Sequence, residues 1–241
     1  MKKLALTLVL LCFTFANAQK KNNRRIKESG VQTTENRTTE TYDAINAGGS
    51  FKVVLVSGKE GDIIIKGEEN LLPHIKIEVV NQELKITTEK NKYISTSNGK
   101  NIIITVPFEN INQVSLTGSG DISTKNTIET NSFVAKLIGS GDLKLNVECK
   151  NLEVNLNGSG DIVLVGKTEN INSTLNGSGD IKATNMKSKN ATVTVSSSGD
   201  NSVYCTESIY ARVSGSGDIK YSGDPKKKDT KVNGSGDIKK S

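Results

Sequence analysis

Seven aspartates recur at a nearly constant spacing and form the most regular array of chemically active groups in the sequence. They are Asp121, Asp142, Asp161, Asp180, Asp200, Asp218 and Asp237. Six of them close a Gly-Ser-Gly-Asp tetrapeptide, and Ser197-Ser198-Gly199-Asp200 replaces the first glycine with serine. If equivalent residues stack about 4.8 Å apart, adjacent carboxylates repel each other by about 1 kcal/mol in water. Each carboxylate therefore needs a stabilising partner.

Two kinds of partner are visible in the sequence, and a bound cation is the third option. The glycine-rich turns supply backbone amides, and four lysines follow an aspartate by two residues on the outward side of the expected strand: Lys144, Lys182, Lys220 and Lys239. Calcium-binding repeats of the toxin type use a nine-residue Gly-Gly-x-Gly-x-Asp period and take ligands from both turns of each coil. Here the period is doubled and the opposite turn has no aspartate row. The sequence favours a structural turn, with a calcium ladder on the seven aspartates as the alternative.

Residues of the types that usually carry catalysis are otherwise sparse. The single histidine, His74, follows a proline in an expected turn, and the glutamates of residues 78–89 lack the paired spacing of a glycosidase. We expect no catalytic residues and no cofactor, and therefore a protein that is not an enzyme.

The two cysteines of the expected mature chain sit at equivalent positions of different repeats. Cys149 lies 12 residues before Asp161, and Cys205 lies 13 before Asp218. Three coils separate them, or about 14 Å, which exceeds the reach of a disulfide. We predict that both are unpaired core or corner residues.

The residues that flank each aspartate predict two short strands per repeat. The position five before it is always apolar, as at Leu137 and Leu156, and the position after it is apolar except at Asn201. Apolar residues alternate with polar ones on both sides, which is the strand period with one face inward. A unit of about 20 residues cannot bury two thin apolar faces alone, so copies must stack. The expected fold is all-β, a right-handed parallel β-helix with a repeating Gly-Ser-Gly-Asp corner.

The remaining chain divides into three expected segments. Residues 42–116 are interpreted as degenerate coils of the same solenoid, with Gly61-Asp62 as a corner, and residues 117–241 as the regular coils. Together they predict about ten coils. Residues 19–41 are polar and aperiodic, which predicts a flexible leader.

Residues 1–18 have the pattern of a signal peptide. Two lysines precede an apolar run that closes on Ala16-Asn17-Ala18 and is too short to span a bilayer. We expect export to the periplasm or cell surface and no transmembrane segment. The formal net charge of +6 falls to +4 when Lys2 and Lys3 are removed with this peptide. Aromatic residues rarely lie beside the basic ones, which argues against nucleic-acid binding.

The repeating corner carries a family resemblance. Gly-Ser-Gly-Asp-Ile, the Val-rich segment of residues 51–56 and the Val106-Pro107 step into residues 111–116 resemble the putative auto-transporter adhesin, head GIN domain family of Bacteroidota envelope proteins. The resemblance spans residues 42–238. It implies a right-handed β-helix, export, and an adhesin role without a defined ligand or active site.

Two functional hypotheses follow. The first is a non-enzymatic envelope protein whose rigid solenoid face binds a glycan or another envelope protein, although the partner itself is unknown. The second is a structural periplasmic module that assembles end to end. Calcium-stabilised repeats are a third, less favoured alternative.

Overall fold

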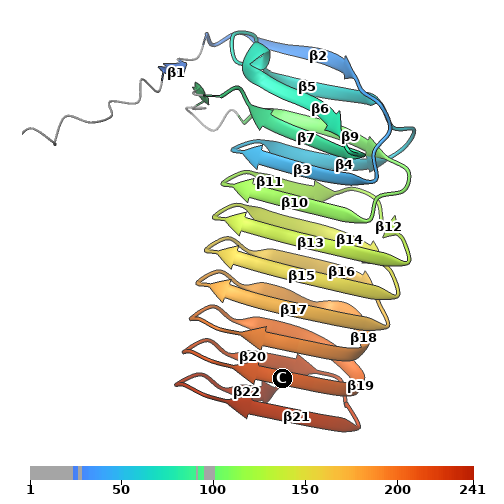
Figure 1. The fold of residues 1–241 in the computed structure, drawn as a ribbon, viewed down its shortest axis with the longest axis vertical. Helices are drawn as coiled ribbons and strands as arrows, with labels where there is room; N and C mark the ends of the chain where they lie inside the picture. Colours follow the sequence, from blue (N-terminus) through green and yellow to red (C-terminus); the bar gives the residue numbers. More distant parts are fainter. Residues whose placement is uncertain (1–23, 27–28, 91, 95–100) are drawn as a thin grey trace, which may run out of the picture.

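The computed structural model describes residues 24–26, 29–90, 92–94 and 101–241. Within them the chain is a parallel β-solenoid of about seven turns, in which two strand faces enclose a thin apolar core. Figure 1 shows the strands stacked along the longest axis, with the C-terminal strands at one end. The predicted signal peptide, residues 1–18, and residues 19–23 of the predicted leader lie outside the described residues.

The strand that precedes each glycine corner contributes to what we call the long sheet. Its strands, in spatial order, are β6 (Ile75–Val80), β7 (Glu83–Thr88), β3 (Ala44–Gly49), β10 (Gln113–Gly118), β13 (Ser132–Gly139), β15 (Asn151–Gly158), β17 (Asn170–Gly177), the second half of β18 (Ile181–Val195), the second half of β19 (Asn201–Val213) and β21 (Lys227–Val232). All neighbours in this sheet are parallel except β6 and β7.

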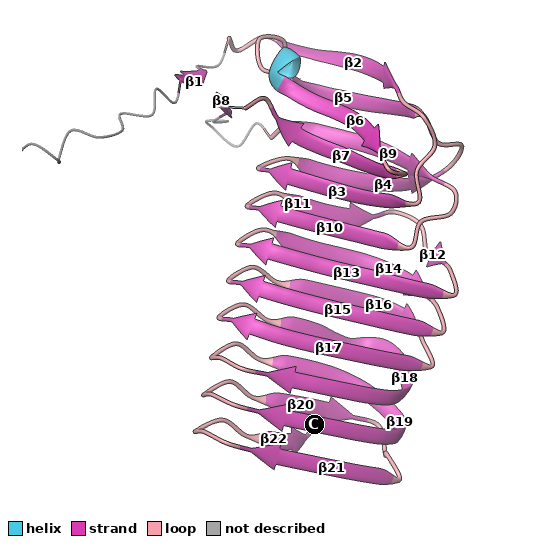
Figure 2. Cartoon of the chain, viewed as in Figure 1, coloured by secondary structure: helices cyan, strands magenta, loops and turns pink. Residues whose placement is uncertain are grey.

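The strand that follows each corner contributes to the short sheet. Its order is β2 (Gln32–Thr38), β5 (Asp62–Glu68), β9 (Ile103–Phe108), β4 (Lys52–Ser57), β11 (Asp121–Thr124) with β12 (Ile128–Glu129), β14 (Asp142–Glu148), β16 (Ile162–Lys167), the first halves of β18 and β19, β20 (Ile219–Ser222) and β22 (Ile238–Lys240). A 3-10 helix, η2 (Leu72–His74), links β5 to β6 (Figure 2), and β1 (Arg24–Ile26) pairs with β8 (Lys92–Ile94).

The predicted register is confirmed in the regular coils. Leu116 pairs with Leu137, Leu137 with Leu156, and Leu156 with Leu175, so equivalent apolar residues lie directly above one another. These residues are buried, as are their counterparts on the short sheet such as Ile162. Burial of such columns removes apolar surface from water and stabilises the stack.

The number of coils predicted from the sequence is wrong, and the reason lies in the strands at the N-terminal end of the solenoid. Strands β2, β5 and β6 run antiparallel to their neighbours and cap one end of the solenoid instead of adding turns. Their alternating apolar residues fit either arrangement, since a strand shows the same period in parallel and antiparallel sheets. The prediction of ten coils is therefore corrected to about seven turns.

Two local predictions in the same region are also corrected. Gly61-Asp62 is not a solenoid corner, because Gly118 pairs with Gly49 and Asp121 with Lys52, so the N-terminal corner is residues 49–52. Part of the predicted leader is structured, since β2 pairs along its length with β5. Polar residues at β2 reflect its place at the outer edge of the cap, where most of its side chains are exposed.

Candidate functional site

The seven predicted aspartates share one register column beside the glycine corner. Five consecutive links join six of them, because the backbone amide of each aspartate donates to the Oδ1 atom of the one before it. The N–O distances are 3.0 Å for the links from Asp161, Asp180 and Asp200, and 2.9 Å for those from Asp218 and Asp237. Asp121 differs, because the amide of Asp142 donates to the Gly120 carbonyl instead. Each of these carboxylates thus accepts a hydrogen bond from the backbone of the next coil.

Three of the four predicted lysines contact the second carboxylate oxygen of an aspartate, whereas Lys144 forms no ion pair among the described residues. Lys182 Nζ lies 2.6 Å from Asp161 Oδ2, Lys220 Nζ lies 2.9 Å from Asp200 Oδ2, and Lys239 Nζ lies 3.4 Å from Asp218 Oδ2. Each lysine reaches back to the preceding coil. These contacts replace part of the like-charge repulsion along the column with opposite-charge attraction.

Two of the aspartates have pKa values below the usual range. Partial burial acts to raise the pKa of Asp161, but hydrogen bonds from Lys182 and from the amide of Asp180 outweigh it. The hydrogen bond from Lys220 is the main cause of the lowered pKa of Asp200. Both carboxylates are therefore held in their charged form by groups of the solenoid itself.

Among the residues that the structure describes, no three histidine, cysteine, aspartate or glutamate side chains gather where they could hold a metal ion. The aspartates from Asp142 to Asp218 each have an oxygen already engaged by a backbone amide. These hydrogen bonds give each of these aspartates a structural role in the turn.

The second glycine of each corner is required by the close approach of neighbouring coils. A Cβ atom on Gly160 would lie 1.8 Å from the carbonyl oxygen of Gly141, and one on Gly179 would lie 1.8 Å from that of Gly160. No side chain fits within such distances. The corner is thus a backbone-on-backbone stack that positions the aspartate column.

The cysteines lie at the opposite corner and are free, as predicted. Cys149, Thr168, Ser188 and Cys205 occupy successive coils at this corner, and Cys149 Sγ lies 3.5 Å from Thr168 Oγ1. Burial raises the pKa of the Cys149 thiol and raises that of Cys205 to about 11. Neither thiol is activated as a nucleophile by its surroundings.

An asparagine ladder that the sequence analysis did not identify begins just after this corner. Asn170 Nδ2 donates to Asn151 Oδ1 at 3.0 Å, Asn190 Nδ2 donates to Asn170 Oδ1 at 3.0 Å, and Ser208 Oγ donates to Asn190 Oδ1 at 2.6 Å. The three asparagines share one register column on the outer face of the long sheet. Their spacing of 19 and 20 residues matches the aspartate period, and this signal was available in the sequence.

The outer face of the long sheet next to the ladder is mainly polar, with Glu153 and Arg212 among its charged residues. Its second column runs from Glu153 through Asn172 and Thr192 to Tyr210, and Tyr210 remains 44% exposed. The Arg212 guanidinium lies over the Tyr210 ring, 3.6 Å from its centroid. A groove of about 370 Å³ follows the start of β13, β15 and β17 and continues to Thr192. We call this surface, with the ladder, the asparagine face.

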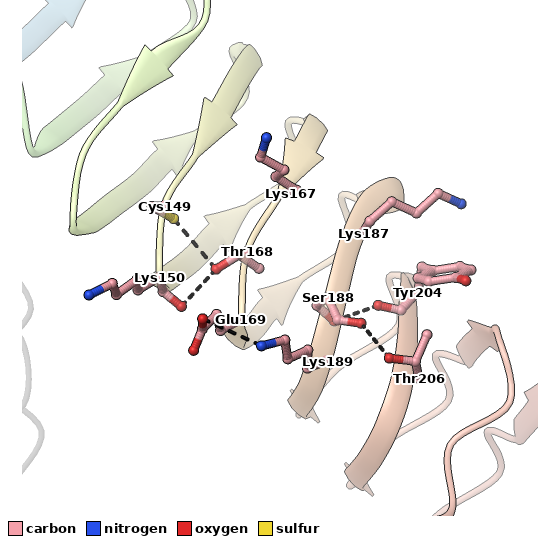
Figure 3. A pocket seen from close by; sticks show the side chains of 10 residues that line it. All are labelled: Cys149, Lys150, Lys167, Thr168, Glu169, Lys187, Ser188, Lys189, Tyr204 and Thr206. Atoms are coloured by element: carbon pink, nitrogen blue, oxygen red, sulfur yellow. Dashed lines mark hydrogen bonds and ion pairs between the residues drawn. The ribbon is translucent and has the colours of Figure 1, made fainter.

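A second groove of about 500 Å³ lies at the corner beside the asparagine ladder (Figure 3). Thr168 and Ser188, which are both buried, contribute to its lining, and Tyr204 lies at one end. Four lysines belong to it: Lys150, Lys167, Lys187 and Lys189. We call it the corner groove.

Comparison with known proteins places the chain in a family. Residues 41–225 match the model of the putative auto-transporter adhesin, head GIN domain family. The chain belongs to this family. The resemblance based on the Gly-Ser-Gly-Asp-Ile corners is therefore confirmed, and the head GIN domain fold is the solenoid described above.

Solved structures agree with this assignment. A putative adhesin from Bacteroides fragilis is 27% identical with a TM-score of 0.83, covering 90% of this chain and 100% of its own. A putative lipid binding protein from Parabacteroides distasonis is 25% identical with a TM-score of 0.74, over 90% and 100% of the two chains. A putative adhesin from Parabacteroides merdae shares the fold at 20% identity, with a TM-score of 0.69 over 90% and 99%. No functionally curated protein matches the sequence.

None of the helices in the described part of the chain has the length and apolar character needed to cross a membrane. Together, the head GIN domain assignment and its adhesin neighbours support an adhesin-like module.

Proposed function

We propose that this head GIN domain protein is an exported, non-enzymatic module of the cell envelope that binds a glycan on its asparagine face. One observation carries the proposal: asparagine, serine and threonine side chains stand in register on the outer face of the long sheet, and the exposed Tyr210 lies in the column beside the ladder.

The ladder is chemically suited to sugar hydroxyls. Asn170 and Asn190 each have one N–H and one carbonyl lone pair engaged along the ladder and keep a second N–H and a second lone pair for a ligand, while Asn151 is engaged there only through its carbonyl. Donor and acceptor therefore repeat from coil to coil about 4.8 Å apart. A sugar hydroxyl both donates and accepts, so it pairs well with such a surface.

Preorganisation adds to this fit. Hydrogen bonds between neighbouring coils hold the side chains of Asn151, Asn170 and Asn190 in place before a ligand arrives. Less side-chain entropy is then lost on binding. Tyr210 supplies an aromatic surface against which the apolar side of a sugar ring packs.

Export and a binding role are supported by the signal-peptide pattern of residues 1–18 and by the adhesin names of the family and of its solved neighbours. The location is the periplasm or the cell surface. The adhesin-like family and the solved neighbours support a protein that is not an enzyme.

The test is binding of the purified chain to an array of neutral and acidic oligosaccharides, followed by titration of the strongest hits. Asn172→Ala and Tyr210→Ala are expected to weaken binding about fivefold each, since one hydrogen bond or stacking contact contributes about 1 kcal/mol. Asn185→Ala is the matched control, because this exposed asparagine lies on β18 where that strand belongs to the short sheet.

A silent array would contradict the proposal. Silence combined with filaments or discrete oligomers in solution scattering would instead support the structural module that assembles end to end.

A further inference from the structure

The corner groove and the asparagine face are neighbours in the sequence and in space. Lys150, Glu169 and Lys189 form one register column at the corner, and each immediately precedes an asparagine of the ladder. Hydrogen bonds from Glu169 N to Lys150 O and from Lys189 N to Glu169 O connect this column. A polymer lying on the ladder therefore runs directly alongside the groove.

The groove has an excess of positive charge in its lining. Its four lysines face one acidic lining residue, Glu169, which lies 3.4 Å from Lys189 Nζ. Lys167 is paired at 2.7 Å with Glu148 just outside the groove. In both pairs the lysine side chain is more than half exposed, so these ion pairs contribute little to stability and exchange readily for a ligand anion.

The other two lysines have no carboxylate partner among the described residues. Lys150 forms no ion pair there, and Lys187 Nζ lies 3.8 Å from the centroid of the Tyr204 ring. Figure 3 shows both side chains extending away from the ribbon, and both residues are exposed. The groove thus presents two cations whose charge is not neutralised by the protein.

We propose that the corner groove binds the anionic substituents of an acidic polysaccharide whose backbone lies on the asparagine face. This inference rests on the proposed function and adds the class of ligand. Charge complementarity carries it: the ladder is neutral, while the adjoining corner groove is lined by four lysines and one glutamate. Carboxylate and sulfate groups share the chemistry that these lysines bind.

The arrangement gives each surface a separate task. The amides of the ladder bind hydroxyls that most glycans have, and so provide contact area. The lysines distinguish charged from neutral polymers, because an uncharged substituent leaves their charges without a partner. Binding is therefore expected to weaken as salt is added.

The experiment titrates the full chain with polygalacturonate, dextran sulfate and neutral dextran at low and physiological salt. Lys150→Gln with Lys187→Gln is expected to weaken binding of both acidic polymers about tenfold, since each exposed charge contact contributes up to about 1 kcal/mol. The control pair is Lys59→Gln with Lys66→Gln, which removes the same charge from exposed lysines near the N-terminal cap. Lys150→Arg with Lys187→Arg is expected to retain binding.

Three outcomes separate this inference from the function on which it rests. Equal binding of the acidic polymers by the glutamine pair and the control pair would show that the corner groove does not bind the anionic substituents. It would leave the proposal of glycan binding intact. Binding of neutral dextran as tightly as the acidic polymers would do the same. If the wild-type chain binds none of the three polysaccharides but binds phosphatidylglycerol vesicles in a parallel titration, both the corner-groove inference and the proposed glycan binding are contradicted.

Discussion

At the scale of single residues, the aspartate column explains how like charges are tolerated at close spacing. Each carboxylate from Asp142 to Asp218 accepts the amide of the next coil, and four of these five also contact a lysine. An aspartate therefore accepts a hydrogen bond from a backbone amide that the corner would otherwise leave unpaired. The carboxylates of adjacent coils repel each other, and the lysines reduce this repulsion. Serine or asparagine at this position would retain a hydrogen-bond acceptor but lose the attraction to lysine.

The lowered pKa values of Asp161 and Asp200 predict loss of stability in acid. A carboxylate whose folded pKa lies below its unfolded value of about 3.9 adds stability above that pH, and the stability is lost as pH falls through the folded pKa. Asp161→Asn with Asp200→Asn keeps the Oδ1 acceptor and removes the charge. We expect this variant to lose about 1 kcal/mol of unfolding free energy at pH 7, because both side chains are more than one third exposed.

Urea unfolding from pH 2 to pH 8 measures this effect. The wild-type midpoint is expected to be level above about pH 5 and to fall below about pH 4, and the variant is expected to fall less steeply. Parallel curves would show that these two charges do not contribute to the acid response. The same unfolding curves with and without a chelator test the calcium ladder, and we expect no difference; a marked loss of stability with chelator would restore that alternative.

At the scale of the elements, the glycine corner sets the spacing of the coils. Gly160→Ala places a Cβ atom within 1.8 Å of a carbonyl oxygen and must push two coils apart. We expect a loss of about 3 kcal/mol in unfolding free energy. Gly48→Ala is the control, since its nearest neighbour would lie 3.6 Å away and its loss is expected to stay within about 0.5 kcal/mol. Similar losses in both variants would contradict the close stacking of the corners.

A buried polar pair interrupts the apolar columns between β17 and β19. Asn201 replaces the isoleucine of adjacent coils, and its Nδ2 atom donates to Ser173 Oγ at 2.8 Å across the core. Asn201 Oδ1 is buried without a hydrogen-bond partner among the described residues. Ser173→Val with Asn201→Ile restores the residues found in neighbouring coils.

This pair gives a prediction with an internal control. Ser173→Ala alone leaves the Asn201 amide unpaired and is expected to cost about 2 kcal/mol, whereas the double variant is expected to be at least as stable as wild type. Thermal unfolding of the three proteins at one scan rate measures the difference. A double variant less stable than Ser173→Ala would mean that the core cannot accept the larger side chains.

The sequence was sufficient for elements that repeat and insufficient for those that do not. Leu137, Leu156 and their equivalents fix the register because any shift by one residue would turn the apolar column outward. The same reasoning failed at Ile63 and Ile65, which alternate equally well in the antiparallel β5. Local pattern specifies a strand and its buried face, while the direction of its neighbour depends on long-range contacts.

The candidate site was predicted only in part, for a related reason. The aspartates were identified because they carry charge at a fixed spacing, and the asparagines of the ladder repeat at nearly the same spacing without charge. The corner groove joins residues from several coils, such as Cys149 and Tyr204, and its shape depends on how far each turn extends. Sequence spacing gives the register of these residues but not the space between them.

At the scale of the whole molecule, the two ends of the solenoid are closed by different means. The antiparallel strands β2 and β6 cover the end that contains the N-terminal strands. At the other end, β21 and β22 each pair with one strand among the described residues. Lys228 and Lys240 stand there in the inward columns, next to Ile209 and Tyr221 of the preceding layer. Inward charges of this kind discourage another sheet edge from pairing.

The last prediction concerns association through this end. Lys228→Ile with Lys240→Ile extends the apolar columns to the final layer, and we expect the double variant to associate reversibly with rising concentration while the wild-type chain stays monomeric. Lys227→Ile with Lys239→Ile is the matched control, because these lysines lie on the same strands in the outward columns of Ser208 and Lys220. Sedimentation velocity over a hundredfold range of concentration distinguishes the three proteins. Wild-type oligomers would contradict the protective role of the inward lysines and support end-to-end assembly, whereas equal association of both variants would show that added apolar surface, not the inward position, drives it.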